Sequence, residues 1–131
     1  MTVTATNLLL VASAAHTTQY VSASTACIVA QWLDISVNVT AFAGVPPNSP
    51  SNSPIVYVSY YRVEADSTQN LLVRFPVIGA PNNLPISAFK TIGIGSELNT
   101  DVGMNFVLKV DLAEGITSAT YSVSVNGKGS S

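Results

Sequence analysis

The feature of this chain that most constrains its fold is a regular alternation of apolar and polar side chains. In the segment WLDISVNVTAF, residues 32–42, the odd positions from 33 to 41 are apolar and the even positions between them are polar. Side chains two residues apart on a strand point to the same face, so this pattern predicts a strand with one buried face. Residues 105–112 and 117–125 repeat the alternation and predict two more.

Other segments favour strands by composition. Residues 55–65 and 71–78 are rich in β-branched and aromatic side chains, and the polar turn at 66–70 between them predicts a hairpin. Pro76 places the far end of the second strand at a sheet edge or a bulge. Weaker patterns predict short strands at three further places, residues 7–14, 25–30 and 89–94.

No segment keeps a helical period, so we predict an all-β fold in one domain, residues 1–131. About seven to eight strands with regular turn signals indicate an antiparallel β-sandwich or jelly roll. Residues 1–24 are either an extended N-terminal arm or part of the sandwich. Residues 44–54 hold four of the seven prolines, which predicts a surface loop between strands.

Composition excludes several classes of protein. Charged residues make up 9% of the chain and hydrophobic residues 47%, the reverse of a disordered segment. The net charge of −2 argues against a nucleic-acid partner, which requires a basic surface. One cysteine excludes a disulfide framework within the chain.

The sequence offers no membrane or export signal that we would assign. No apolar run approaches the roughly 18 residues of a transmembrane helix. The apolar stretch 7–15 has no Lys or Arg before it, since the first basic residue is Arg62, so a signal peptide is not expected. We therefore expect synthesis in a cytoplasm and no membrane partner.

The candidates for catalysis are few. His16 is the single histidine, and no nucleophile-elbow motif accompanies it, so a solvated loop histidine is expected. Cys27 lies in an apolar run and is expected to be a buried small hydrophobe. One Cys and one His cannot supply a zinc site. We expect no enzyme activity, no metal and no cofactor, and leave open a calcium site built from loop carboxylates, namely Asp66, Glu97, Asp101 and Glu114.

The remaining charged and aromatic side chains favour structural roles. Arg62 with Glu64, and Lys109 with Asp111, are two residues apart and are expected to pair on a solvent face or across strands. Strand packing is favoured over a sugar-binding platform for the large aromatic residues, which are Trp32, Tyr20, Tyr57, Tyr60, Tyr61 and Tyr121.

The polar faces of the predicted strands carry Ser, Thr and Asn rather than Lys and Glu. A free domain usually keeps charges on its surface for solubility and on its edge strands against aggregation. We therefore predict that much of this surface contacts other protein. The contact residues expected are those of the N-terminal segment and the proline-rich loop: Thr2, Val3, Thr4, Leu8, Leu10, Pro46, Pro47, Pro50 and Pro54.

The hydroxyl- and valine-rich segments LDISVNVTAF, YVSYYRVEAD, FVLKVDLAEG and YSVSVNG resemble virion structural proteins of tailed bacteriophages, above all capsid decoration or cement proteins. The resemblance implies localisation in the virion and homo-oligomers, often trimers, that bridge subunits of the major capsid protein. Tail-tube, tail-tip or fibre subunits are an alternative. A glycan-binding module for host recognition is an alternative of another class.

Overall fold

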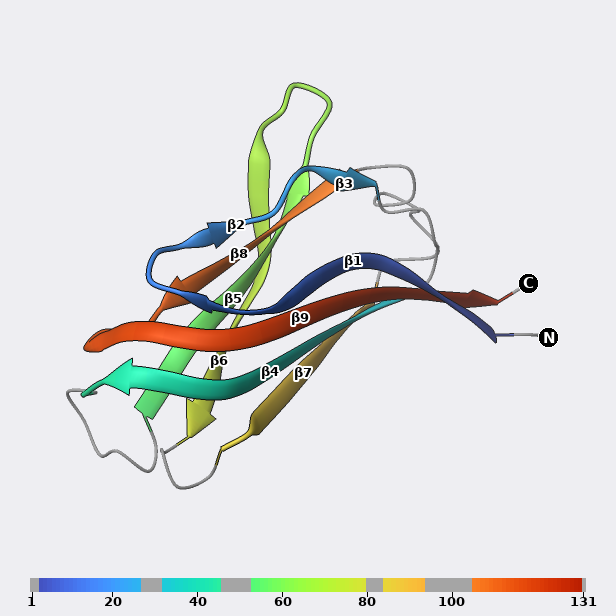
Figure 1. The fold of residues 1–131 in the computed structure, drawn as a ribbon. Coiled ribbons are helices and arrows are strands. Elements are labelled where there is room, and N and C mark those ends of the chain that lie inside the picture. The colour runs from blue at the N-terminus through green and yellow to red at the C-terminus, as the bar shows by residue number, and fades with distance from the viewer. Residues whose placement is uncertain (1–2, 27–31, 46–52, 80–83, 94–104, 131) are drawn as a thin grey trace.

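The computed structural model describes residues 3–26, 32–45, 53–79, 84–93 and 105–130 (Figure 1). Every regular element within these ranges is a β-strand. The strands are β1 (Val3–His16), β2 (Tyr20–Val21), β3 (Thr25–Ala26), β4 (Trp32–Gly44), β5 (Ser53–Val63), β6 (Gln69–Gly79), β7 (Ile86–Gly93), β8 (Asn105–Leu112) and β9 (Ile116–Ser130).

The strands form two antiparallel sheets. The four-stranded sheet has the order β1-β9-β4-β7, and the five-stranded sheet has the order β2-β8-β5-β6 with β3 also on β8. The chain crosses between the sheets at every connection except β2–β3 and the β5–β6 hairpin. This alternation is the strand order of a jelly roll, so the predicted β-sandwich is confirmed.

The alternating apolar and polar residues of β4 lie on the two opposite faces of the four-stranded sheet. Strand β4 pairs with β9 on one side, Val37 opposite Val123, and with β7 on the other, Val37 opposite Ala88. The odd-numbered side chains of β4 are buried from Leu33 to Val39, whereas Ser36 is exposed. Burying one face of the strand therefore places the polar set on the outside.

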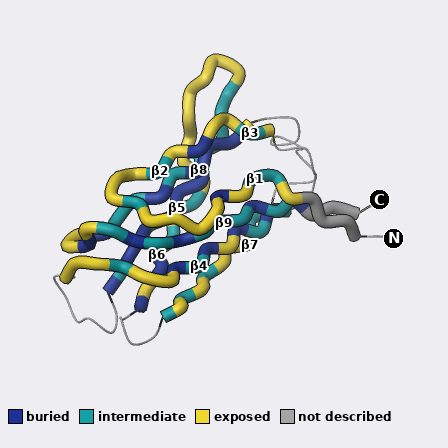
Figure 2. Tube along the Cα trace, in the orientation of Figure 1, coloured by how far each residue is buried: buried dark blue, intermediate teal, exposed yellow. Residues whose placement is uncertain are grey.

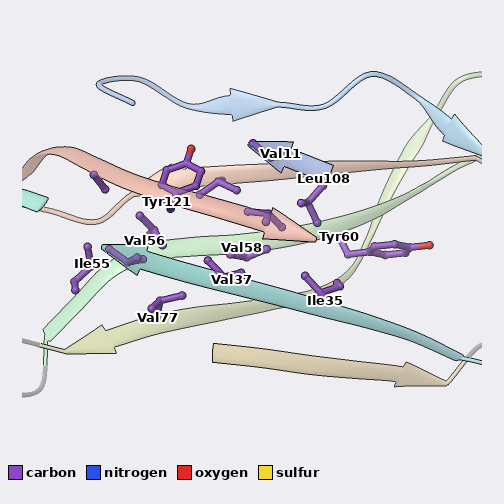
Figure 3. Packing of buried hydrophobic residues seen from close by; sticks show 14 of the residues in the cluster. Val11, Ile35, Val37, Ile55, Val56, Val58, Tyr60, Val77, Leu108 and Tyr121 are labelled. Atoms are coloured by element: carbon purple, nitrogen blue, oxygen red, sulfur yellow. The ribbon is translucent and has the colours of Figure 1, made fainter. Parts of the chain in front are cut away.

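Apolar side chains of both sheets meet in one core (Figure 3). Buried residues, dark blue in Figure 2, occur on strands of both sheets. Ile35 and Val37 of β4 lie among Val58 of β5 and Leu108 of β8, and Tyr60 stacks on Phe106 with ring centroids 5.1 Å apart. Each fully buried aliphatic side chain contributes about 1.5–3 kcal/mol, so this layer supplies most of the favourable free energy.

The N-terminal segment is a strand rather than a detached arm. β1 runs antiparallel to β9, from Val3 opposite Ser130 to His16 opposite Ala119. The chain then crosses to β8, where Ser22 donates its backbone N–H to the carbonyl of Leu108 and accepts the Leu108 N–H on its hydroxyl, both at 2.9 Å. Only Thr25–Ala26 of the strand predicted at 25–30 forms β3, and the rest lies outside the described residues.

The proline-rich loop is shorter than predicted. β4 continues to Gly44 and β5 begins at Ser53, so Pro54 lies inside a strand. A bulge follows Pro54 on the β6 side, and pairing with β8 begins only at Val56. The missing N–H of Pro54 therefore falls before the second ladder starts, where a strand tolerates proline.

The predicted hairpin is confirmed and projects from the body of the sandwich (Figure 1). Its turn is closed by the Glu64 N–H, which donates to the Thr68 carbonyl at 2.8 Å, and Ser67 has a φ of 72°. β6 is the edge strand of its sheet and contains Pro76, as the sequence predicts.

The edge strand β7 of the four-stranded sheet is protected against added strands in a different way. Lys90 lies opposite Ile35, whose side chain is fully buried, so Lys90 leaves β7 on the core-facing side. It is exposed because β7 is the last strand of the sheet. Inward-pointing charge on an edge strand is a known defence against added strands.

Gly44 provides a test of how β4 ends. Its φ is 112°, and a Cβ at this position would overlap the carbonyl oxygen of Gly115. We expect Gly44→Ala to lower the free energy of unfolding by about 2 kcal/mol, because both backbone and contact would be strained. Urea denaturation measures this, with Ala43→Ser as the exposed neighbouring control. Equal stability of the two variants would contradict the assigned close approach.

Candidate functional site

The outer face of the four-stranded sheet combines polar side chains with two large exposed apolar ones. Its central cross-strand row runs Leu10, Ser124, Ser36 and Phe89, one residue from each strand. Asp34 is the one charged group on this face among the described side chains, and its Oδ1 accepts a hydrogen bond from the Thr91 hydroxyl at 2.8 Å. Over its described side chains, the face is therefore almost uncharged.

Hydroxyl and amide groups of neighbouring strands hydrogen-bond to each other across this face. Asn7 Nδ2 donates to Ser124 Oγ and to Asn126 Oδ1, both at 3.1 Å. On the same face, between β4 and the edge strand β7, the Ser87 hydroxyl donates to Asn38 Oδ1 at 3.0 Å. These contacts fix the orientation of the hydroxyl and amide groups. Each group still has donor or acceptor sites with which it can hydrogen-bond to a partner protein.

A groove crosses the face between its two edge strands, with a volume of about 330 Å³. Its floor includes Ser36, Ser122 and Ser124, and Leu10 and Phe89 stand at its two sides. Leu10 is 68% exposed and Phe89 is 75% exposed. Two large exposed apolar side chains therefore flank a floor that includes small hydroxyl side chains.

The structure distributes the predicted contact residues unevenly. Leu10 is exposed on the outer face, whereas Leu8 is half-buried against the core. Pro54 is half-buried in β5, opposite Ile78. Val3 and Thr4 belong to β1. The remaining four, Thr2, Pro46, Pro47 and Pro50, lie outside the described residues.

Phe89 was not predicted as a contact residue. A signal for it exists in the sequence ISAFKT, where Ser87, Phe89 and Thr91 share one strand face. A phenylalanine among polar positions of a strand predicts either a core residue or an exposed contact, and only the strand pairing decides between them.

His16 is not the solvated loop histidine that the sequence suggests. It is the last residue of β1, half-buried, and it stacks on Tyr121 with ring centroids 4.4 Å apart. Its Nε2 and the Tyr121 hydroxyl are both buried without a hydrogen-bond partner among the described groups. Burial raises the pKa of the Tyr121 hydroxyl far above its usual range. Cys27 lies outside the described residues, so its relation to His16 stays a prediction.

No cluster of three or more His, Cys, Asp or Glu residues occurs in the described ranges. Of the loop carboxylates considered for calcium, Glu97 and Asp101 fall outside them. Within the same ranges, no helix has the length and apolar character needed to cross a bilayer.

One of the two predicted charge pairs is present. Arg62 and Glu64 form an ion pair at 2.6 Å, and Asn70 Nδ2 donates to the same Glu64 oxygen at 2.9 Å. The prediction for the second pair is wrong, because Asp111 accepts a hydrogen bond from Gln19 at 2.6 Å and Lys109 lies over the Tyr61 ring.

The aromatic residues do not form a shared platform. Tyr60 and Tyr121 are buried in the core, which confirms packing for those two. Tyr57 and Tyr61 face outward on the five-stranded sheet, each beneath a basic side chain. Trp32 is half-buried at the start of β4.

The Glu64 network predicts a pH dependence. Hydrogen bonds from Arg62 and then Asn70 hold the pKa of Glu64 below its ordinary value of 4.5. The carboxylate therefore contributes stability above that value, and the contribution is lost as the pH falls through the lowered pKa. We expect Arg62→Gln to raise the pKa of Glu64 in a carboxyl NMR titration and to reduce the loss of stability below pH 4.5.

Asp66 is the internal control for this titration. Its pKa is lowered by hydrogen bonds from Thr68, so Arg62→Gln should leave it unchanged. A Glu64 titration that is identical in both proteins would contradict the assigned cause.

Comparisons with known proteins give a limited result. No protein-family model and no curated protein matches the chain. Among solved structures, it is similar to the K3 cleaved adhesin domain of Lys-gingipain from Porphyromonas gingivalis W83, with 9% identity and a TM-score of 0.44 over 83% of this chain and 61% of that one. It is also similar to a chain of infectious bursal disease virus, Gx strain, with 12% identity and a TM-score of 0.38 over 95% and 31%. The chain thus spans less than two thirds of either, and these likenesses carry no functional argument.

Proposed function

We propose that this protein is a non-enzymatic structural subunit of a virion, of the capsid-decoration type, and that it contacts its neighbours through the outer face of the four-stranded sheet. The observation that carries the proposal is the composition of that face. It combines hydrogen-bonding groups with two exposed apolar side chains, Leu10 and Phe89, and has one charged group among its described side chains.

The energetics of such a face favour protein contact. An aromatic side chain buries about 150–250 Å² when fully covered, and each Å² of apolar area contributes roughly 25 cal/mol. Hydroxyl and amide groups can exchange water for partner groups without the large desolvation cost of a charge. Contact over this face would therefore gain apolar burial at Leu10 and Phe89 with little electrostatic penalty.

The jelly roll supports the proposal without deciding it. The same architecture carries viral capsid domains and lectins, so the fold is compatible with both of the classes considered from the sequence. A decoration protein acts by binding the assembled shell and not its separated subunits, which stabilises the assembly by mass action. The expected partners are a second copy of this chain, with a trimer as the closed form, and a major capsid protein.

The test is the oligomeric state of the protein by light scattering over a wide concentration range. We expect a fixed oligomer, and we expect the double variant Leu10→Ser, Phe89→Ser to dissociate, because it removes the apolar part of the contact. The matched control is Leu71→Ser, Ile78→Ser, which removes two exposed apolar side chains from the other sheet. A monomeric parent protein, or an oligomer insensitive to the double variant, would contradict the proposal.

A glycan-binding module is the second candidate, favoured by the same groove. Phe89 has an exposed ring beside the hydroxyl and amide groups of Ser36, Asn38 and Ser87. A sugar could pack its ring on the aromatic face and hydrogen-bond to the polar groups. A glycan array distinguishes the two: binding that is abolished by Phe89→Ser in a monomeric protein assigns the groove to sugar, and a blank array removes this candidate.

A further inference from the structure

The outer face of the five-stranded sheet differs from that of the other sheet because basic side chains gather on it. In one cross-strand row, Ser59 of β5 lies opposite Lys109 of β8 on one side and Arg74 of β6 on the other. Because neighbouring strands are about 4.8 Å apart, the two basic residues are separated by roughly 10 Å at their Cα atoms. Both long side chains can therefore reach the space above Ser59.

Two tyrosines flank the same serine along β5. The Arg74 guanidinium lies over the Tyr57 ring and the Lys109 ammonium lies over the Tyr61 ring, each 4.5 Å from the ring centroid. Tyr57 and Tyr61 are two residues on either side of Ser59, so the two cations are held on opposite sides of it.

Ser59 is a buried hydroxyl with an unused donor. Its side chain belongs to the outer face, because its neighbours Val58 and Tyr60 point into the core. The residue is 1% exposed, and its Oγ has no hydrogen-bond partner among the described groups. A buried hydroxyl without a partner is uncommon in a native fold and calls for an explanation.

The three groups together form a set of donors that lacks an acceptor. In the described part of the chain no carboxylate forms an ion pair with Arg74 or Lys109. The carboxylate of the adjacent row, Asp111, is hydrogen-bonded to Gln19 at 2.6 Å. A guanidinium has five N–H donors, so Arg74 over the Tyr57 ring still has donors for a planar or tetrahedral oxyanion.

We propose that Ser59, Arg74 and Lys109 bind an oxyanion, the carboxylate or sulfate group of a ligand. The Arg74 edge donates two hydrogen bonds to its oxygens, the Lys109 ammonium turns from Tyr61 to donate a third, and the Ser59 hydroxyl donates from below. Tyr57 and Tyr61 hold the two cations apart until the anion arrives. This site is independent of the function proposed for the other sheet.

The net charge of the chain opposes the binding of an anion. At −2, the molecule as a whole repels anions, so the attraction at this row must come from its own two cations. Two solvent-accessible cations attract an anion strongly only at low ionic strength, since salt screens exposed charges. Binding should therefore weaken as salt rises, yet saturate at fixed ionic strength, which separates a site from general screening.

The experiment is an amide NMR titration of the whole chain with sodium sulfate, at ionic strength held constant with sodium chloride. We expect saturable shifts at Ser59 and its cross-strand neighbours. Arg74→Gln and Lys109→Gln should each weaken binding by about tenfold or more, the effect of losing a charged hydrogen-bond donor. Ser59→Ala should weaken it less and leave the fold intact, because it removes a buried hydroxyl that has no partner.

Lys90→Gln is the matched control, since Lys90 is an exposed lysine on the other sheet. Its sulfate affinity, and the sulfate-induced shifts at Ser59 and its neighbours, should equal those of the parent protein. Shifts that grow linearly with sulfate, or that persist in the double variant Arg74→Gln, Lys109→Gln, would overturn the site.

Two further titrations distinguish the sources of the anion. Acetate presents a bare carboxylate and glucuronate presents the same group on a sugar ring. Tighter binding of glucuronate than of acetate assigns the site to acidic sugars, which could also contact Tyr57 or Tyr61. Equal binding of the two assigns it to the oxyanion alone.

Discussion

The structure depends on the pairing of β4 with β9, which lie together in the middle of the four-stranded sheet. Their register places Ile35 opposite Val125 and Val37 opposite Val123, so the valine-rich faces of both strands enter the core together. A slip by one residue would turn the serines inward and the valines out. The core and the groove are therefore two consequences of one register, and neither can change without the other.

The sequence predicted those parts of the fold that rest on local pattern. The alternation in β4, β8 and β9 and the turn between β5 and β6 follow from spacing and turn residues alone. The position of Pro54 inside β5 could not be predicted, because its tolerance depends on where two ladders begin. The setting of His16 also escaped prediction, since its partner Tyr121 is far along the chain.

The two outer faces show how a chain with few charges uses them. On the four-stranded sheet, hydroxyl and amide groups hydrogen-bond to one another, and Leu10 and Phe89 remain exposed. On the outer face of the five-stranded sheet, Arg74 and Lys109 lie over tyrosine rings and form no ion pair with a described carboxylate. Leu10 could be named from the sequence, whereas the row around Ser59 could not, because it joins three strands whose registers local pattern does not fix.

Lys90 has a consequence for the geometry of any assembly. A strand added to the free edge of β7 would cover its ammonium and remove it from water, with fully buried Ile35 as its cross-strand neighbour. The cost of that desolvation recurs with every copy added, so it disfavours every step of a ribbon that grows through this edge. Contacts between copies are thereby directed from β7 toward the faces of the sandwich, where an interface can close on itself and stop at a fixed number of subunits.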